Sequence, residues 1–168
     1  MDKALKHFFL LTILFFCSVS LFAENRAEFG TDWSFSWAFK DEEIEFTMTA
    51  PTTGWMALGF NPTRRMKDAD YILAFVENGQ VYLSDEFGTG LTTHRSDVTL
   101  GGEDSARAIS FLEEKNRTTI TFSLARDSKD LYDATFVPGE KCTVIAAYAT
   151  SKNLSTKHRK RDSVDIIL

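Results

Sequence analysis

The amino-acid sequence predicts an all-β protein built as an antiparallel sandwich of about nine short strands. Three observations predict this class: apolar and polar residues alternate with a period of two, short apolar runs are separated by frequent turn signals, and helical periodicity is weak. The chain is also rich in phenylalanine, with 15 in 168 residues. Large aromatic side chains suit the space between two packed sheets, so we expect most of these rings in the core.

The first predicted hairpin joins strands at residues 33–39 and 44–48. In its first strand four aromatic residues alternate with small ones, which puts their rings on one face. These residues are Trp33, Phe35, Trp37 and Phe39. The charged residues 40–43 form the turn, and apolar residues alternate again from Ile44 to Met48. Residues 55–60 then predict a buried strand, and residues 61–70 a polar, charged loop.

The strongest turn signal is Asn78-Gly79, between predicted strands at residues 71–76 and 81–87. Both residue types accept the positive φ that a two-residue hairpin turn requires. Residues 88–96 are expected to be irregular, and residues 106–112 and 118–124 form another strand pair. Strands at residues 142–149 and 164–168 complete the sandwich, and residues 128–134 are expected to hold one turn of helix.

The N-terminal residues have the pattern of an export signal. Lys3 and Lys6 precede an apolar run at residues 8–22, and small residues close the run, which predicts cleavage after Ala23. This run is shorter than the roughly 20 apolar residues of a membrane span. We therefore expect a signal peptide at residues 1–23, a single domain at residues 24–168, a secreted or periplasmic protein, and no stable membrane insertion after cleavage.

The composition of the expected mature chain excludes several classes of protein. Its 17 basic and 23 acidic side chains give a net charge of −6, which argues against nucleic acid as a partner. Its single cysteine, Cys142, falls in an apolar strand and is expected to be a buried, inert thiol. The sequence has no Gly-x-Ser-x-Gly turn, no paired zinc ligands and no glycine-rich phosphate loop. We therefore expect that the protein is not an enzyme.

Two residues are candidate metal ligands. Met66 lies in a polar loop where no apolar periodicity explains it, and His158 lies in a basic segment before the last strand. A thioether and an imidazole are the axial ligands of many electron-transfer haems, and this pair raises the reduction potential. Arginines flank both residues, and arginine binds carboxylates such as haem propionates through parallel hydrogen bonds. The arginines concerned are Arg64, Arg65, Arg159 and Arg161. From spacing alone, a simpler interpretation also explains these residues. The charged side chains would be hydrated in surface loops, and the methionine would lie on the surface without a function.

An ordered set of segments in this chain resembles the DOMON family. It comprises Gly54-Trp55-Met56-Ala57-Leu58-Gly59-Phe60, then Met66-Lys67-Asp68-Ala69-Asp70-Tyr71, and finally His158 with Arg161, Ser163 and the strand from Val164. The opening aromatic strand fits as well, so the resemblance covers about residues 29–168.

The resemblance implies an immunoglobulin-like β-sandwich of about ten strands. In haem-binding members, such as the cytochrome domain of cellobiose dehydrogenase, a methionine and a histidine hold haem b, and Met66 and His158 fall at the matching positions. It therefore implies an exported electron-transfer domain that binds haem b and serves a redox partner protein. His94 is a reserve ligand. The sequence does not divide the apolar residues that flank the Met66 loop between the haem slot and the core; they are Trp55, Met56, Leu58, Phe60, Tyr71 and Ile72.

Two other functions remain open from the sequence. Some family members are thought to bind sugars, so the same fold without haem would be a carbohydrate or small-ligand module. Exposed aromatic residues such as Trp33 or Tyr82 would then form a stacking platform. Alternatively, the basic loops would dock an acidic partner protein, and that association would depend strongly on salt concentration.

Overall fold

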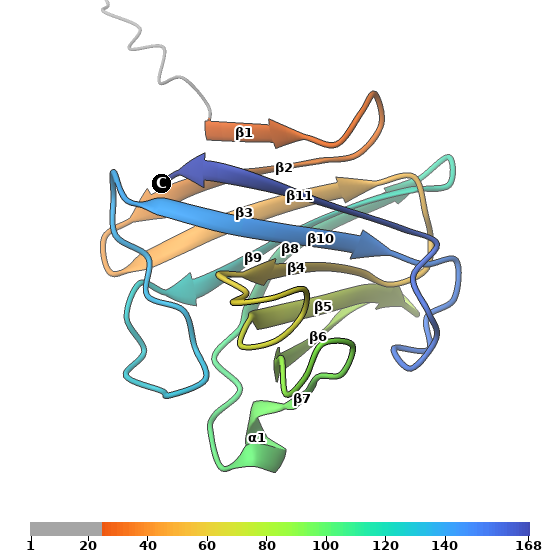
Figure 1. Ribbon diagram of the computed structural model, residues 1–168. Helices are drawn as coiled ribbons and strands as arrows, with labels where there is room; N and C mark the ends of the chain where they lie inside the picture. Colours follow the sequence, from red (N-terminus) through yellow and green to blue (C-terminus); the bar gives the residue numbers. More distant parts are fainter. Residues whose placement is uncertain (1–24) are drawn as a thin grey trace, which may run out of the picture.

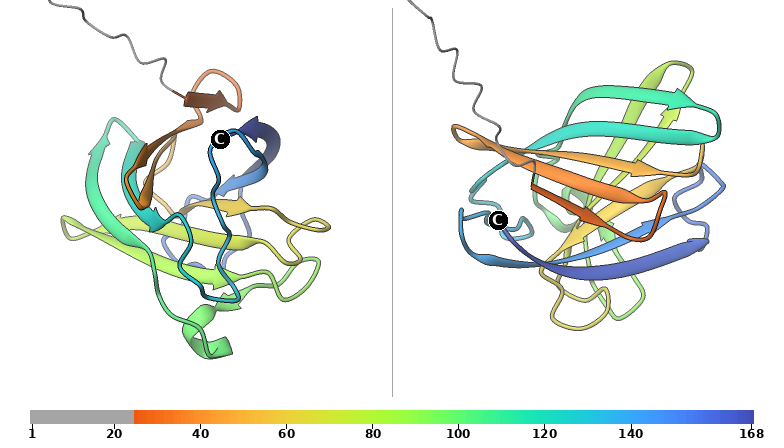
Figure 2. Two further views of the ribbon diagram at one scale, coloured as in Figure 1. Left: turned by 90° about the vertical axis from the view of Figure 1, so that its left-hand side faces the viewer. Right: turned by 90° about the horizontal axis from the view of Figure 1, so that it is seen from above.

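A computed structural model describes residues 25–168, so the predicted signal peptide and its cleavage site lie outside the described residues. Within that part of the chain, antiparallel strands form two sheets that pack face to face as a sandwich (Figures 1 and 2). The all-β prediction is therefore confirmed. No helix among residues 25–168 is long and apolar enough to cross a membrane.

One sheet has five strands and the other has six. The five-stranded sheet contains, in spatial order, β1 (Asn25–Glu28), β2 (Ser34–Lys40), β3 (Glu43–Ala50), β9 (Arg117–Ala125) and β8 (Arg107–Glu114). The six-stranded sheet contains β11 (Lys160–Ile167), β10 (Lys141–Tyr148), β4 (Met56–Phe60), β5 (Asp70–Glu77), β6 (Gln80–Phe87) and β7 (Arg95–Ser96). One short helix, α1 (Asp97–Leu100), follows β7 at the lower end of the molecule in Figure 1.

The core between the two sheets is built from alternate residues of their inner faces. In β3 every second residue is buried, and the Phe46 ring lies 4.8 Å from Phe60 of the opposite sheet, measured between ring centroids. The aromatic residues of β2 also face this core, as their alternation predicted. Cys142 is buried there, as expected, and this burial raises the pKa of its thiol to about 12.

The predicted hairpin turn at Asn78-Gly79 is confirmed, since the two residues have φ angles of 50° and 74°. The predicted turn of helix at residues 128–134 is wrong. The Asp130 amide donates to the Ser128 hydroxyl, and the Tyr132 amide donates to the Asp130 carboxylate. These local bonds occupy the backbone N–H groups that a helix would use. β11 also begins at Lys160, so Arg161 lies in a strand rather than in the predicted loop.

Candidate functional site

The outer face of the six-stranded sheet carries an apolar cluster that is separate from the core, and Figure 1 looks onto this face. We call it the outer cluster. Its buried members are Trp55, Ala57, Ala69, Tyr71, Leu73 and Ala149, and its partly buried members are Met66, Phe75, Ile145, Ala147 and Leu154. The outer face of an antiparallel sheet is usually polar, so this apolar surface marks a candidate binding site.

Two loops flank the outer cluster, and each carries one predicted ligand. The β4–β5 loop, residues 61–69, carries Met66, and the β10–β11 loop, residues 149–159, carries His158. They approach the sheet at opposite ends of β4, which spans about 13 Å. Both loops nevertheless contribute to one cluster, the first through Met66 and the second through Leu154. In Figure 1 the β4–β5 loop, drawn in yellow, lies in front of the sheet.

Trp55 and Tyr71 each hold one of these loops. The Trp55 indole Nε1 donates to the Thr156 hydroxyl at 3.2 Å, within the β10–β11 loop. The Tyr71 hydroxyl donates to the backbone oxygen of Met66 at 3.4 Å. Both side chains are buried in the outer cluster, so each predicted lining residue is packed beside one candidate ligand loop.

The other apolar residues that flank the Met66 loop lie elsewhere. Side chains alternate between the two faces of a strand, and β4 and β5 follow this rule strictly. The residues that face the core between the sheets are Met56, Leu58, Phe60 and Ile72. The sequence left this division open, because a short apolar run does not reveal which of its two faces is internal.

The backbone of Gly88 forms hydrogen bonds with the Met66 loop. Its N–H donates to the Ala69 oxygen and its own oxygen accepts from the Asp68 N–H, both at 2.8 Å. A Cβ atom added at Gly88 would lie 1.8 Å from the backbone oxygen of Met66. Only glycine therefore permits this close approach, and the approach fixes the position of the Met66 backbone.

Replacing Gly88 by alanine should displace the Met66 loop and lower the free energy of unfolding by about 1–3 kcal/mol, as overpacking does elsewhere. Urea unfolding of the purified protein measures this change. Gly90→Ala is the matched control, because a Cβ there would meet only the Thr93 hydroxyl, at 2.7 Å, and that side chain can rotate away. Equal destabilisation by the two substitutions would contradict a specific role for Gly88.

His158 is half-buried two residues before β11. Burial lowers the pKa of its imidazole, and the neighbouring charges of Arg161 and Lys157 lower the pKa further. The neutral ring is favoured as a result, and this is the form in which histidine binds metals. The backbone N–H of Arg159 donates to the Tyr148 oxygen at 2.8 Å, which fixes the chain next to His158.

The four predicted propionate partners are all exposed; they are Arg64, Arg65, Arg159 and Arg161. Across residues 25–168 the ion pairs involve other basic side chains, so these four guanidinium groups are left without an acidic partner. Two of them flank each candidate ligand, Met66 and His158. They are therefore available to an anionic group at the rim of the outer face.

His94, the reserve ligand, also lies on this face. Its ring centroid is 5.8 Å from that of Tyr71, and its Nδ1 pairs with the Glu86 carboxylate. A histidine oriented by a carboxylate is a common arrangement in metal sites, so His94 needs a direct test. Glu86 did not emerge from the sequence, although its place in the alternation of β6 puts it on the outer face beside Tyr71.

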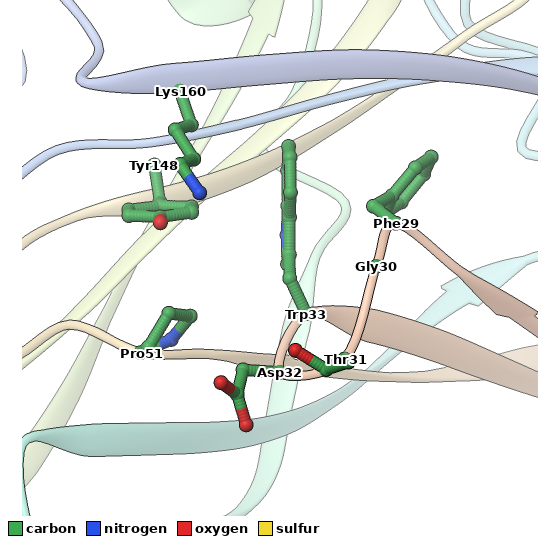
Figure 3. A pocket seen from close by; sticks show the side chains of 8 residues that line it. All are labelled: Phe29, Gly30, Thr31, Asp32, Trp33, Pro51, Tyr148 and Lys160. Carbon is green, nitrogen blue, oxygen red and sulfur yellow. The ribbon is translucent and has the colours of Figure 1, made fainter.

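The two aromatic residues expected as exposed stacking platforms, Trp33 and Tyr82, differ in exposure. Trp33 is 7% exposed, and its ring packs 4.7 Å from Phe29 and 5.1 Å from Tyr148, so the expectation that it is an exposed platform was wrong. It lines a cleft of about 220 Å³ with Asp32 and Lys160, shown in Figure 3. Tyr82 in contrast is 41% exposed, and its ring stacks nearly parallel on Phe75 at 5.0 Å. Tyr82 is therefore an exposed aromatic ring that Phe75 supports from one side.

A comparison with models of known protein families shows to which family this chain belongs. The model of the DOMON domain family matches residues 30–149, which is more than half of the sequence. The chain belongs to the DOMON family. The matched range of this DOMON domain includes Met66, Trp55 and Tyr71 and ends before His158.

Several curated proteins are similar to this DOMON domain. Human DBH-like monooxygenase protein 1 is 26% identical over 119 residues, which cover 71% of this chain and 18% of that protein. Mouse DBH-like monooxygenase protein 2 is 29% identical over 117 residues, which cover 69% of this chain and 18% of that protein. The chain thus spans less than a fifth of the length of these relatives.

Two solved structures share the fold. The cytochrome b domain of Coprinopsis cinerea pyranose dehydrogenase superposes with a TM-score of 0.61 at 13% identity, covering 80% of this chain and 76% of that one. The cytochrome domain of Myriococcum thermophilum cellobiose dehydrogenase gives 0.62 at 12% identity, covering 81% and 74%. At these identities the likeness shows that this chain shares their fold.

Proposed function

We propose that this DOMON domain binds one haem b between Met66 and His158 and exchanges single electrons with a redox partner protein. The observation that carries the proposal is the apolar outer face, which lies between two loops that each bear one suitable donor. The cytochrome domains with the same fold support it, because their names describe the same kind of module.

The residues present fit a haem in three respects. The thioether of Met66 and the neutral imidazole of His158 form a donor pair found in electron-transfer haems. Small side chains, among them Ala57 and Ala147, line the sheet between the loops, which suits a flat ligand. The unpaired arginines beside both loops suit the two propionates.

Haem entry requires the two loops to part. Ala57 and Leu73 are already buried within the outer cluster, so the side chains that cover them have to move aside. Trp55 and Tyr71 tether the loops through single side-chain hydrogen bonds, and such bonds can re-form after a small displacement.

The domain itself makes and breaks no substrate bonds in this proposal. Bound haem would supply one-electron chemistry, while the protein excludes water from the apolar face and sets the potential through its axial ligands. We further propose that the protein is exported by its N-terminal signal and acts outside the cytoplasm, in a secreted or periplasmic location.

Absorption spectroscopy of the purified mature protein titrated with haem tests this function. We expect one haem per chain and a sharp low-spin spectrum in both the oxidised and the reduced state. A protein that remains colourless, or a stable high-spin spectrum in the wild type, would overturn the proposal.

The second candidate is a carbohydrate-binding module without haem. The exposed Tyr82 ring, which stacks on half-buried Phe75, favours it, because sugars stack on flat aromatic rings. Glycan binding by the colourless protein that is lost in Tyr82→Ala would support this function. If the wild-type protein binds haem and retains no glycan, the sugar proposal fails.

A further inference from the structure

Four aspartates converge at the lower end of the sandwich, away from the outer cluster. Asp70 begins β5, Asp85 lies on β6, Asp97 begins α1, and Asp133 lies in the β9–β10 loop. Asp70 and Asp85 have the same alternation as the core residues of their strands, so both point between the sheets. One carboxylate oxygen from each of Asp70, Asp85 and Asp133 lies within 4.8 Å of the other two.

Hydrogen bonds satisfy only one side of this cluster. The Asp70 Oδ2 accepts from the Ala134 N–H at 2.9 Å, and the Asp85 Oδ2 accepts from the Ser105 N–H and hydroxyl at 3.0 and 2.8 Å. The Oδ1 atoms of Asp70, Asp85 and Asp133 are buried and have no donor. The N–H groups of Ala134 and Ser105 and the Ser105 hydroxyl thus orient the first two carboxylates and leave their other oxygens without a donor.

Asp97 gives an independent indication that something is bound here. Its side chain is fully buried, at 0% exposure, yet neither of its carboxylate oxygens has a hydrogen-bond partner. It lies close to Asp85 and contacts the Asp133 carboxyl. A buried carboxylate without a donor or a counter-charge is costly, and such groups in proteins are paired or coordinate a metal.

Basic side chains do not balance this charge. In the described chain every ion pair involves other acidic residues, and none includes Asp70, Asp85, Asp97 or Asp133. The nearby Lys129 pairs with Asp127 instead. The cluster is therefore a buried anionic site with several free oxygens and no cation of its own.

We propose that Asp70, Asp85, Asp97 and Asp133 form a binding site for one Ca²⁺ ion. Calcium takes six to eight oxygen ligands at about 2.3–2.6 Å, so one ion can bridge oxygens up to roughly 5 Å apart. The oxygens of Asp70, Asp85 and Asp133 fit that span, because they lie within 4.8 Å of one another. Mg²⁺ fits less well, because it needs shorter distances and a nearly ideal octahedral arrangement of ligands.

An open cavity gives the ion a route to the site. It has a volume of about 470 Å³ and includes Ser105, which holds Asp85, and Asp133 itself among its lining residues. Asp130 lines it too, and this carboxylate adds negative charge at the entrance. Both acidic residues attract a divalent cation toward the buried oxygens.

The bound ion would tie four separate segments together. Asp70 and Asp85 belong to the six-stranded sheet, whereas Asp97 and Asp133 belong to α1 and the β9–β10 loop, which close the lower end of the sandwich (Figures 1 and 2). Calcium should therefore stabilise this end of the molecule. This inference does not depend on haem binding, so the two proposals can fail independently.

Calcium titration of the chelator-treated mature protein tests the site, with calorimetry and thermal unfolding as readouts. At a Ca²⁺ concentration about 100-fold above the dissociation constant, the unfolding midpoint should rise by about 5–10 °C. Mg²⁺ should produce a clearly smaller shift. Absence of both a binding heat and a shift with Ca²⁺ would overturn the proposal.

Isosteric variants assign the response to the cluster. Asp85→Asn and Asp97→Asn should abolish the calcium shift, and in chelator their midpoints should equal or exceed that of the wild type, because an amide removes the buried charge. Glu114→Gln, an exposed change on β8, should respond to calcium like the wild type. If either cluster variant keeps the full shift, the site is wrong.

A luminescent probe covers the case in which the variants fail to fold. Tb³⁺ added to the wild type should give sensitised emission through Tyr132, the neighbour of Asp133, and excess Ca²⁺ should quench that emission. Emission that calcium does not reduce would contradict a shared calcium site.

Discussion

Replacing His158 by alanine should lower the haem affinity of the protein by at least about 100-fold. Loss of a residue that only supports a metal ligand costs up to about 100-fold, and loss of the ligand itself should cost at least as much. Met66→Ala should retain weaker binding and convert the low-spin spectrum to a high-spin one, because a single axial ligand remains. Met66→His should restore a low-spin spectrum with a lower reduction potential than the wild type, since the methionine ligand raises the potential. Haem titration followed by spectroelectrochemistry measures all three effects.

His94→Ala is the control that separates the two histidines. His94 lies against Tyr71 on the same outer face, and its Nδ1 is occupied by Glu86. This substitution should leave the low-spin spectrum unchanged. If His94→Ala abolishes that spectrum while His158→Ala preserves it, His94 is the iron ligand and our assignment of His158 is wrong.

The strands were predictable because their side chains alternate. The alternation from Ile44 to Met48 placed β3 in the core, and the Asn78-Gly79 turn set the register of β5 and β6. Short elements without a full period were missed, namely β1, β7 and α1. The helical turn was misplaced because Ser128 and Asp130 form local side-chain bonds, which a hydropathy pattern does not contain.

The site was less predictable, because it depends on which face of a strand is covered. The sequence identified Met66, Trp55 and Tyr71 but not the division of their neighbours between core and outer face. Gly88 and Glu86 act through contacts with segments distant in the sequence, which a single chain does not reveal. The aspartate cluster did have a signal, since Asp70 and Asp85 occupy inward positions next to Ile72 and Leu83.

The largest loss of stability should follow Phe46→Ala. Phe46 is fully buried, and its ring lies 4.8, 5.8 and 5.5 Å from those of Phe60, Phe122 and Phe136. These rings join both sheets and the β9–β10 loop, so truncation leaves a cavity that rigid neighbours cannot fill. We expect a cost of about 3–5 kcal/mol in the free energy of unfolding.

Urea unfolding measures this cost as a lower midpoint with an unchanged slope, since the surface exposed on unfolding stays similar. A loss of this size is a large share of the 5–15 kcal/mol typical of a domain, so the variant should be only marginally folded. Phe111→Ala is the matched control, because Phe111 is 41% exposed on β8 and should cost less than about 1 kcal/mol. Equal costs at Phe46 and Phe111 would mean that the aromatic cluster does not hold the two sheets together.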